Sequence, residues 1–260
     1  NNVKKAIELI LSAKKPVIWS GMGVLMSGAS KELTEFAELT EVPVYCTMPG
    51  KSGFDQRHPL SLGSGSGAAS QEARTWLQDS DVLFAVGSSM SRTSYGQPIP
   101  DGKVIIHNTE TVEDLNKDFI VDCGLVGDSK LTLQMLIQEV KSQLGPDGRK
   151  GSTNVAAEIK DIHDKWMSGW TEILATDEVP ISGYRVIGEM VRVLDLENSV
   201  VTHDAGAPRD MIMPFYPGTV PHSYVGWGKT THLGYGIPLM TGVKLACPDK
   251  FCINFMGDGA

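Results

Sequence analysis

The sequence predicts an α/β protein: a doubly wound, Rossmann-like parallel sheet followed by the truncated start of a second parallel α/β domain. Short apolar runs of strand composition alternate with amphipathic helical segments over residues 1–144. A cluster of Gly, Pro and charged residues then interrupts this alternation, and a strand–helix–strand pattern resumes after residue 180. We therefore expect a first domain at 1–144, a linker at 145–180 and a second domain at 181–260.

The composition restricts the partners. A chain of 260 residues with 41% hydrophobic content can form one large or two ordinary domains. The net charge of −8 argues against nucleic acid or an anionic membrane surface as the main partner. No apolar run approaches the roughly 18 residues that span a bilayer. The four cysteines form no CxxC pair, so we expect free thiols and a cytoplasmic location.

Hydrophobic periodicity predicts the elements of the first domain. Amphipathic spacing predicts helices over residues 3–13, 29–39, 68–78 and 128–144. Apolar runs predict strands over residues 16–19, 42–46, 81–87, 103–107 and 119–121. We expect the glycine-containing stretches 20–28 and 47–70 to be loops.

The second domain begins with a helix that Ser182 caps, because a hydroxyl residue precedes apolar residues at core spacing. Strands are predicted at 199–203 and 251–256, with a helix rich in small residues over 233–246 between them. The second strand leads directly into Gly257-Asp258-Gly259. Glycine lets a phosphate approach the backbone, and a carboxylate is a hard oxygen ligand for Mg²⁺. Alone, this tripeptide is more often a structural turn.

A second glycine-rich stretch, 226–238, surrounds bulky Leu233 at the start of a predicted helix. Structural loops rarely combine this backbone freedom with an apolar side chain, whereas a cofactor lying against a helix N-terminus requires both.

Three other motifs have a plainer interpretation. The run from Gly21 to Gly28 is too long for GxGxxG, so a nucleotide site there stays open while a structural crossover is expected. Lys51 lies in a segment that ends like a P-loop but lacks its first glycine, which indicates a turn.

His203 and Asp204 could be a general base and its partner, but neighbouring strand residues point to opposite faces, which favours a polar strand end. The other histidines show no metal-ligand spacing.

The order of motifs resembles the thiamine-diphosphate-dependent decarboxylases and carboligases, and the acetolactate-synthase-like branch most closely. The resemblance rests on Leu233-Gly-Tyr-Gly-Ile-Pro and Met256-Gly257-Asp258-Gly259 in the second domain. In the first domain, His58-Pro59-Leu60, Asp81-Val82-Leu83 and Val126-Gly127-Asp128 fall in the family order. It covers nearly the whole chain.

The resemblance implies the roles of individual residues. Asp258 would be the first Mg²⁺ ligand, and Leu233 would hold thiamine diphosphate in a bent conformation. Arg209 lies in a loop where many relatives carry Gln and His, and we hypothesise that it contributes charge toward the diphosphate. Lys229 and Thr231 also depart from the family pattern by replacing glycines. The implied cofactor-binding residues are Gly206, Ala207, Arg209, Thr231, Leu233, Gly257, Asp258, Gly259 and Ala260.

The resemblance also implies an enzyme that acts on a 2-oxo acid or related acyl donor as a homodimer or homotetramer. The activating glutamate and the second metal ligand of the family are expected outside this chain, so no catalytic residue is assigned and the chain alone is expected to be inactive. The first domain could bind FAD, ADP, CoA or nothing. Arg92, Thr93 and Gly96 are the candidates for a pyrophosphate, and Glu110 is the candidate for a ribose. The alternatives are a nucleotide-binding module and a non-catalytic regulatory relative.

Overall fold

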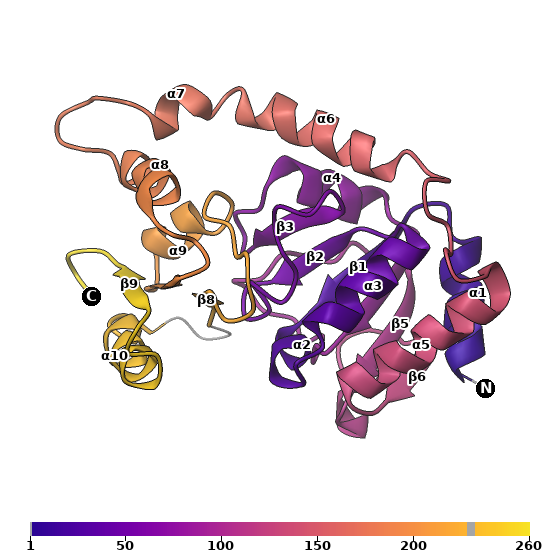
Figure 1. Ribbon diagram of the computed structural model, residues 1–260. Coiled ribbons are helices and arrows are strands. Elements are labelled where there is room, and N and C mark those ends of the chain that lie inside the picture. Colours follow the sequence, from indigo (N-terminus) through magenta and orange to yellow (C-terminus); the bar gives the residue numbers. More distant parts are fainter. Residues whose placement is uncertain (1, 228–231) are drawn as a thin grey trace.

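A computed structural model describes residues 2–227 and 232–260, and it contains two parallel sheets (Figure 1). The larger sheet has six strands in the order β3-β2-β1-β4-β5-β6. The chain moves outward from β1 in one direction and from β4 in the other, so the strand order reverses between β1 and β4. The α/β fold class is confirmed. The strands are β1 (Pro16–Ser20), β2 (Val44–Thr47), β3 (Ser61–Gly65), β4 (Val82–Val86), β5 (Val104–Thr109) and β6 (Cys123–Val126).

Helices cover both faces of this sheet, because its strands are apolar on each side. One face packs against α1, α3 and α5, and the other packs against α4 and α6. Asp128 caps α5, as predicted, by accepting a hydrogen bond from the amide of Leu131 at 2.9 Å. None of the helices in the described ranges is long and apolar enough to cross a membrane. The bounds are α1 (Asn2–Ser12), α2 (Met22–Met26), α3 (Ser30–Thr40), α4 (Gln71–Asp79), a 3₁₀ turn (Val112–Asp114), α5 (Ser129–Leu144) and α6 (Val155–Met167).

The smaller sheet has the order β8-β7-β9, and its strands are also parallel. Ser182 caps α8 through a hydrogen bond from the amide of Tyr184, as predicted. Ile187 of α8 and Val201 of the central strand are both fully buried in the core of this unit. The elements are α7 (Thr171–Leu174), α8 (Gly183–Val193), β7 (Ser199–His203), α9 (Ala207–Ile212), β8 (Tyr224–Val225), α10 (Gly236–Ala246) and β9 (Phe251–Phe255).

Three local predictions were wrong. The predicted strand at 119–121 is not a strand: Ile120 is 84% exposed, and pairing with β5 begins only at Cys123. The stretch 47–70 contains β3, whose small polar residues lack strand composition but pair with β2. The stretch 20–28 contains the five-residue helix α2.

The linker helix α6 lies against the first domain and also contacts the second unit, which Figure 1 shows as a span between the two parts. His163 of α6 bonds Glu72 of α4, with 2.9 Å between Nδ1 and Oε1. The ring of Trp166 stacks on that of Phe215 in the second unit at a centroid distance of 5.3 Å. The linker is therefore packed against both parts. The proposed boundaries at 144 and 180 stay predictions.

Lys51 makes a deeply buried polar contact between the two parts. Its side chain is fully buried, and its ammonium group donates to Gln56 Oε1 at 2.7 Å and Ser64 Oγ at 2.8 Å. The third hydrogen bond crosses to the second unit, where the carbonyl of Met213 accepts at 3.0 Å. The ring of Tyr224 lies 5.0 Å from the same nitrogen. The motif with an incomplete P-loop pattern is thus part of a contact between the two parts.

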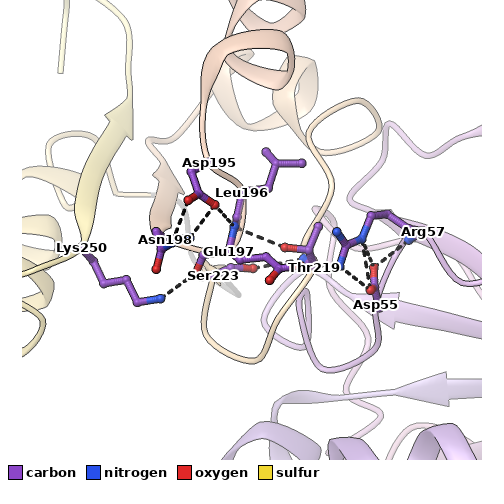
Figure 2. Close-up of polar contacts among 9 residues, drawn as sticks. All are labelled: Asp55, Arg57, Asp195, Leu196, Glu197, Asn198, Thr219, Ser223 and Lys250. Carbon is purple, nitrogen blue, oxygen red and sulfur yellow. Dashed lines mark hydrogen bonds and ion pairs between the residues drawn. The ribbon is translucent and has the colours of Figure 1, made fainter.

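Close packing and an exposed ion pair extend this interface. A Cβ on Gly226 would lie 1.8 Å from the carbonyl oxygen of Met48, so only glycine fits there. Figure 2 shows Arg57, of the first domain, contacting both Asp55 and Glu197. Glu197 lies just before β7, and its carboxylate is 3.1 Å from Arg57. Since both partners are exposed, this ion pair contributes much less than the buried contacts.

We expect Lys51 to make stability depend on pH. Burial lowers the pKa of Lys51 to about 7, whereas a lysine in the unfolded chain titrates near 10.4. Between these values the unfolded state binds more protons, so stability rises with pH by up to about 1.4 kcal/mol per pH unit. Below about pH 7 both states are protonated and this slope vanishes. The measurement is the free energy of urea unfolding across this pH range.

Substitution of Lys51 separates its contribution to the pH dependence of stability from the contributions of other titrating groups. Lys51→Met removes the ammonium while keeping an unbranched side chain, so this part of the pH slope should disappear. Lys165→Met, at an exposed position of α6, is the matched control and should keep the slope of the unmodified chain. Equal slopes in the two variants would contradict the assignment.

Candidate functional site

The candidate site forms where β7 and β9 end side by side in the smaller sheet. The amide of Asp204 donates to the carbonyl of Phe255 at 2.9 Å, so the two following loops start together. A Cβ on Gly257 would lie 3.8 Å from Pro208, and one on Gly234 would lie 3.7 Å from Ala260. The turn after β7, the start of α10 and the loop after β9 therefore converge, as expected for a ligand site at the carboxyl ends of parallel strands.

Asp204 holds this convergence together. Its side chain is fully buried, and its carboxylate accepts the amides of Ala205 at 2.7 Å, Gly234 at 3.0 Å and Gly236 at 3.0 Å. Oδ1 binds the first two amides, and Oδ2 binds the third. Asp204 thus fixes the backbone on both sides of Tyr235. The sequence indicated only a polar strand end here, because the partners lie about 30 residues away.

His203 is a structural neighbour of the site. It is buried, its Nδ1 lies 3.0 Å from the hydroxyl of Tyr224, and its Nε2 lies 3.2 Å from the carbonyl of Trp227. The ring of Trp227 stacks on the imidazole at 5.2 Å. Burial lowers the pKa of His203 to about 4, so the ring is neutral at neutral pH. Both nitrogens are engaged, in agreement with a polar strand end.

Arg209 points toward the first domain. Its guanidinium forms a double hydrogen bond with Asp210 at 2.9 and 2.8 Å and lies 5.1 Å from the ring of Tyr95. Asp210 in turn accepts from Ser66 Oγ at 2.5 Å. Arg209 is 7% exposed, and its Nη1 has no hydrogen-bond partner in the described structure. Its hypothesised role toward a diphosphate stays a prediction.

The remaining candidates leave the site open to a ligand. Gly206 has φ of +82°, and neither Gly206 nor Gly259 has a heavy atom within 4 Å of an added Cβ. Leu233 is 61% exposed, and Asp258 is exposed with no side-chain partner among the described residues. Ala207 begins α9, beside this open turn. Thr231, like Lys229, lies outside the described residues.

The residues of the candidate site meet part of what thiamine diphosphate and a metal ion require for binding. The open glycine turns leave room for phosphate oxygens near the backbone, and the exposed carboxylate of Asp258 is a suitable Mg²⁺ ligand. Within the described ranges no cluster of three or more His, Cys, Asp or Glu side chains forms a complete metal site. Two amides at the start of α10 are already bonded to Asp204, so they are not free to bind a phosphate.

The first domain has its own cavity at the strand-order reversal. It encloses about 420 Å³ and is lined by residues that follow β1 and β4, including Gly21 and Gly87. The pyrophosphate candidates Arg92, Thr93 and Gly96 also line it. Glu110 is exposed and is not among the lining residues. The first three candidates are thus brought together, and the ribose candidate is not.

Comparison with known families decides what the two parts are. The family model described as "Thiamine pyrophosphate enzyme, central domain" matches residues 3–136. The model described as "Thiamine pyrophosphate enzyme, C-terminal TPP binding domain" matches residues 204–260. The chain belongs to the thiamine pyrophosphate enzyme family. The converging loops after β7 and β9 therefore lie in the part that matches the family's cofactor-binding domain.

The curated relatives agree. The chain is 31% identical to a probable acetolactate synthase large subunit from Methanococcus aeolicus, over 99% of this chain and 44% of the relative. It is 26% identical to the acetolactate synthase isozyme 3 large subunit of Escherichia coli K12, with the same coverage. A glyoxylate carboligase from Escherichia coli O157:H7 is 28% identical over 98% of this chain and 43% of its own length. The chain spans less than half the length of these relatives.

Substitution of Asp204 tests whether its hydrogen bonds hold the loops of the candidate site together. Asp204→Asn replaces one acceptor oxygen with an NH₂ group that faces backbone amides, and it should destabilise the chain by about 1–3 kcal/mol. The measurement is the free energy of urea unfolding. Asp249→Asn, at an exposed position beyond α10, is the matched control and should change little. Similar free energies for both variants would show that Asp204 does not hold the loops.

Proposed function

We propose that this chain is part of a thiamine-diphosphate- and Mg²⁺-dependent decarboxylase or carboligase of the acetolactate-synthase type. The substrate class is a 2-oxo acid or a related acyl donor. The observation that carries the proposal is the convergence of the turn after β7, the start of α10 and the loop after β9 within the segment that matches the family's cofactor-binding domain. These three loops contain Gly206, Leu233 and Asp258. The same site argues against a module that binds only a nucleotide, because such a module would not need these loops.

The chain's own residues would bind and orient the cofactor. Asp258 would coordinate Mg²⁺, while Gly257, Gly259 and Ala260 would surround the diphosphate with little steric bulk. Leu233, held next to the backbone that Asp204 fixes, would support the cofactor in its bent conformation. When bound, thiamine diphosphate supplies a carbon that adds to the carbonyl of the substrate and stabilises the negative charge that develops there.

We also propose the assembly and location that agree with this activity. The activating glutamate would come from outside this chain, in a homodimer or homotetramer. The exposed side chains of Leu233, Tyr235 and Ile237 are consistent with contacts to further protein or cofactor. The four free cysteines agree with a reducing cytoplasm.

A flavin in the first domain is the second cofactor proposal. The cavity at the strand-order reversal is the position where doubly wound sheets bind nucleotides, and Arg92 could meet a pyrophosphate there. Since Glu110 is not among the residues that line the cavity, the ribose would depend on other groups. Flavin absorbance in the purified full-length polypeptide would support FAD, and its absence would remove it.

Asp258 provides the direct test of the main proposal. In the full-length polypeptide, Asp258→Asn should weaken Mg²⁺-dependent binding of thiamine diphosphate by roughly tenfold or more, because a charged metal ligand becomes neutral. Calorimetric titration with the cofactor, with and without Mg²⁺, gives the dissociation constants. Formation of acetolactate from pyruvate should fall in parallel.

The control for this test is Asp249→Asn, since Asp249 precedes the same strand but lies at its opposite end. It should bind the cofactor like the unmodified protein. If Asp258→Asn also binds thiamine diphosphate with unchanged affinity and Mg²⁺ dependence, the proposed metal ligand is wrong.

A further inference from the structure

A second cavity, distinct from both sites described above, lies where the two parts of the chain meet the linker helix. It encloses about 660 Å³. The segment 56–63 of the first domain forms one wall, α6 forms another, and residues 214–217 of the second unit form the third. None of the residues proposed for thiamine diphosphate or a flavin lines it.

The ionisable side chains that line this cavity are mostly basic. Four are basic, namely Arg57, His58, Lys160 and His163, and the one acidic lining residue is Glu72. Glu72 is only 4% exposed, and its Oε1 bonds Nδ1 of His163 at 2.9 Å. This hydrogen bond raises the pKa of His163 above its ordinary value and favours an imidazolium. Glu72 is thereby paired with His163 through Oε1, whereas its buried Oε2 has no hydrogen-bond partner among the described residues.

Two of these basic groups, although each has an acidic partner, keep unused N–H donors that a ligand could accept. Arg57 is occupied by Asp55 and Glu197, as Figure 2 shows. His58 has its Nε2 next to Glu38 at 3.3 Å and accepts the amide of Leu60 at its Nδ1.

By contrast, Nε2 of His163 has no hydrogen-bond partner among the described residues. Within the same described ranges, Lys160 pairs with exposed Asp164 alone, one turn along α6. Lys160 and His163 are three residues apart on this helix, so their side chains lie on one face of it.

Apart from Gln56, Ser61 and Ser70, the rest of the lining is apolar. Buried Ile159 and half-buried Met167 belong to α6, and half-buried Phe215 belongs to the second unit. Phe215 is held in place by its stacking on Trp166. A molecule inside the cavity would therefore exchange water for an apolar surface along most of its body.

We propose that this cavity is a binding site for a small organic anion. Its carboxylate or sulfonate would pair with Lys160 and His163, and its apolar body would lie against Ile159, Met167 and Phe215. A bound molecule would contact the first domain, the linker helix and the second unit at once. It would then stabilise their arrangement by its binding free energy. This site is independent of the proposed thiamine-diphosphate chemistry.

The test uses 8-anilinonaphthalene-1-sulfonate as the anionic probe and N-phenyl-1-naphthylamine as a neutral probe of similar shape. Fluorescence titration gives the dissociation constant of each dye for the chain. In a Lys160→Ala/His163→Gln double variant, the sulfonate should bind roughly tenfold more weakly, because two charge-assisted contacts are lost. The neutral dye should keep its affinity.

Two further variants locate the binding. Ala157→Trp places a bulky ring at an exposed position of the lining and should weaken both dyes. Lys165→Ala removes an exposed charge of the same helix outside the lining and should change neither affinity. The proposal is overturned if the double variant binds the sulfonate as tightly as the Lys165→Ala control. It is also overturned if Ala157→Trp leaves both dyes unaffected.

Discussion

The ammonium group of Lys51 lies where the two halves of the chain meet, and all three of its hydrogen bonds go to neutral oxygens. A buried cation is costly unless its donors are satisfied, so Gln56, Ser64 and the carbonyl of Met213 must stay in place together. The first two belong to the large sheet's domain and the third follows α9. The position of the second unit, and with it the end of β7, therefore depends on this contact.

The predicted fold was largely correct, because strong local patterns determine the elements that matter most. β4 is apolar at every position and buried at every position. β3 could not be predicted, since its sequence Ser-Leu-Gly-Ser-Gly becomes a strand only by pairing with β2. Lys51 was interpreted as part of a turn for a similar reason: its partner Met213 is 162 residues away.

In the candidate site, too, local sequence patterns pointed to some residues, whereas the roles of others depend on contacts with residues far away in the sequence. The strand–glycine pattern drew attention to Asp258, but only the family resemblance implied its role as a metal ligand; it lies exposed in the loop after β9. Asp204 was not recognised as the residue that organises the site, because its role arises from contacts with the start of α10. In the proposed cofactor site, rigid positioning by Asp204 and the exposed carboxylate of Asp258 would be complementary, since such a site needs a fixed frame and free ligands.

The docking of α6 has a consequence for how the chain unfolds. A helix between two domains can act as a flexible tether, but α6 bonds Glu72 on one side and stacks Trp166 on Phe215 on the other. Unfolding of either part would expose apolar surface of this helix to water and weaken its packing against the other part. We therefore expect the cooperative folding unit to extend across the predicted linker, so that the predicted domain boundary would not be a boundary in cooperativity.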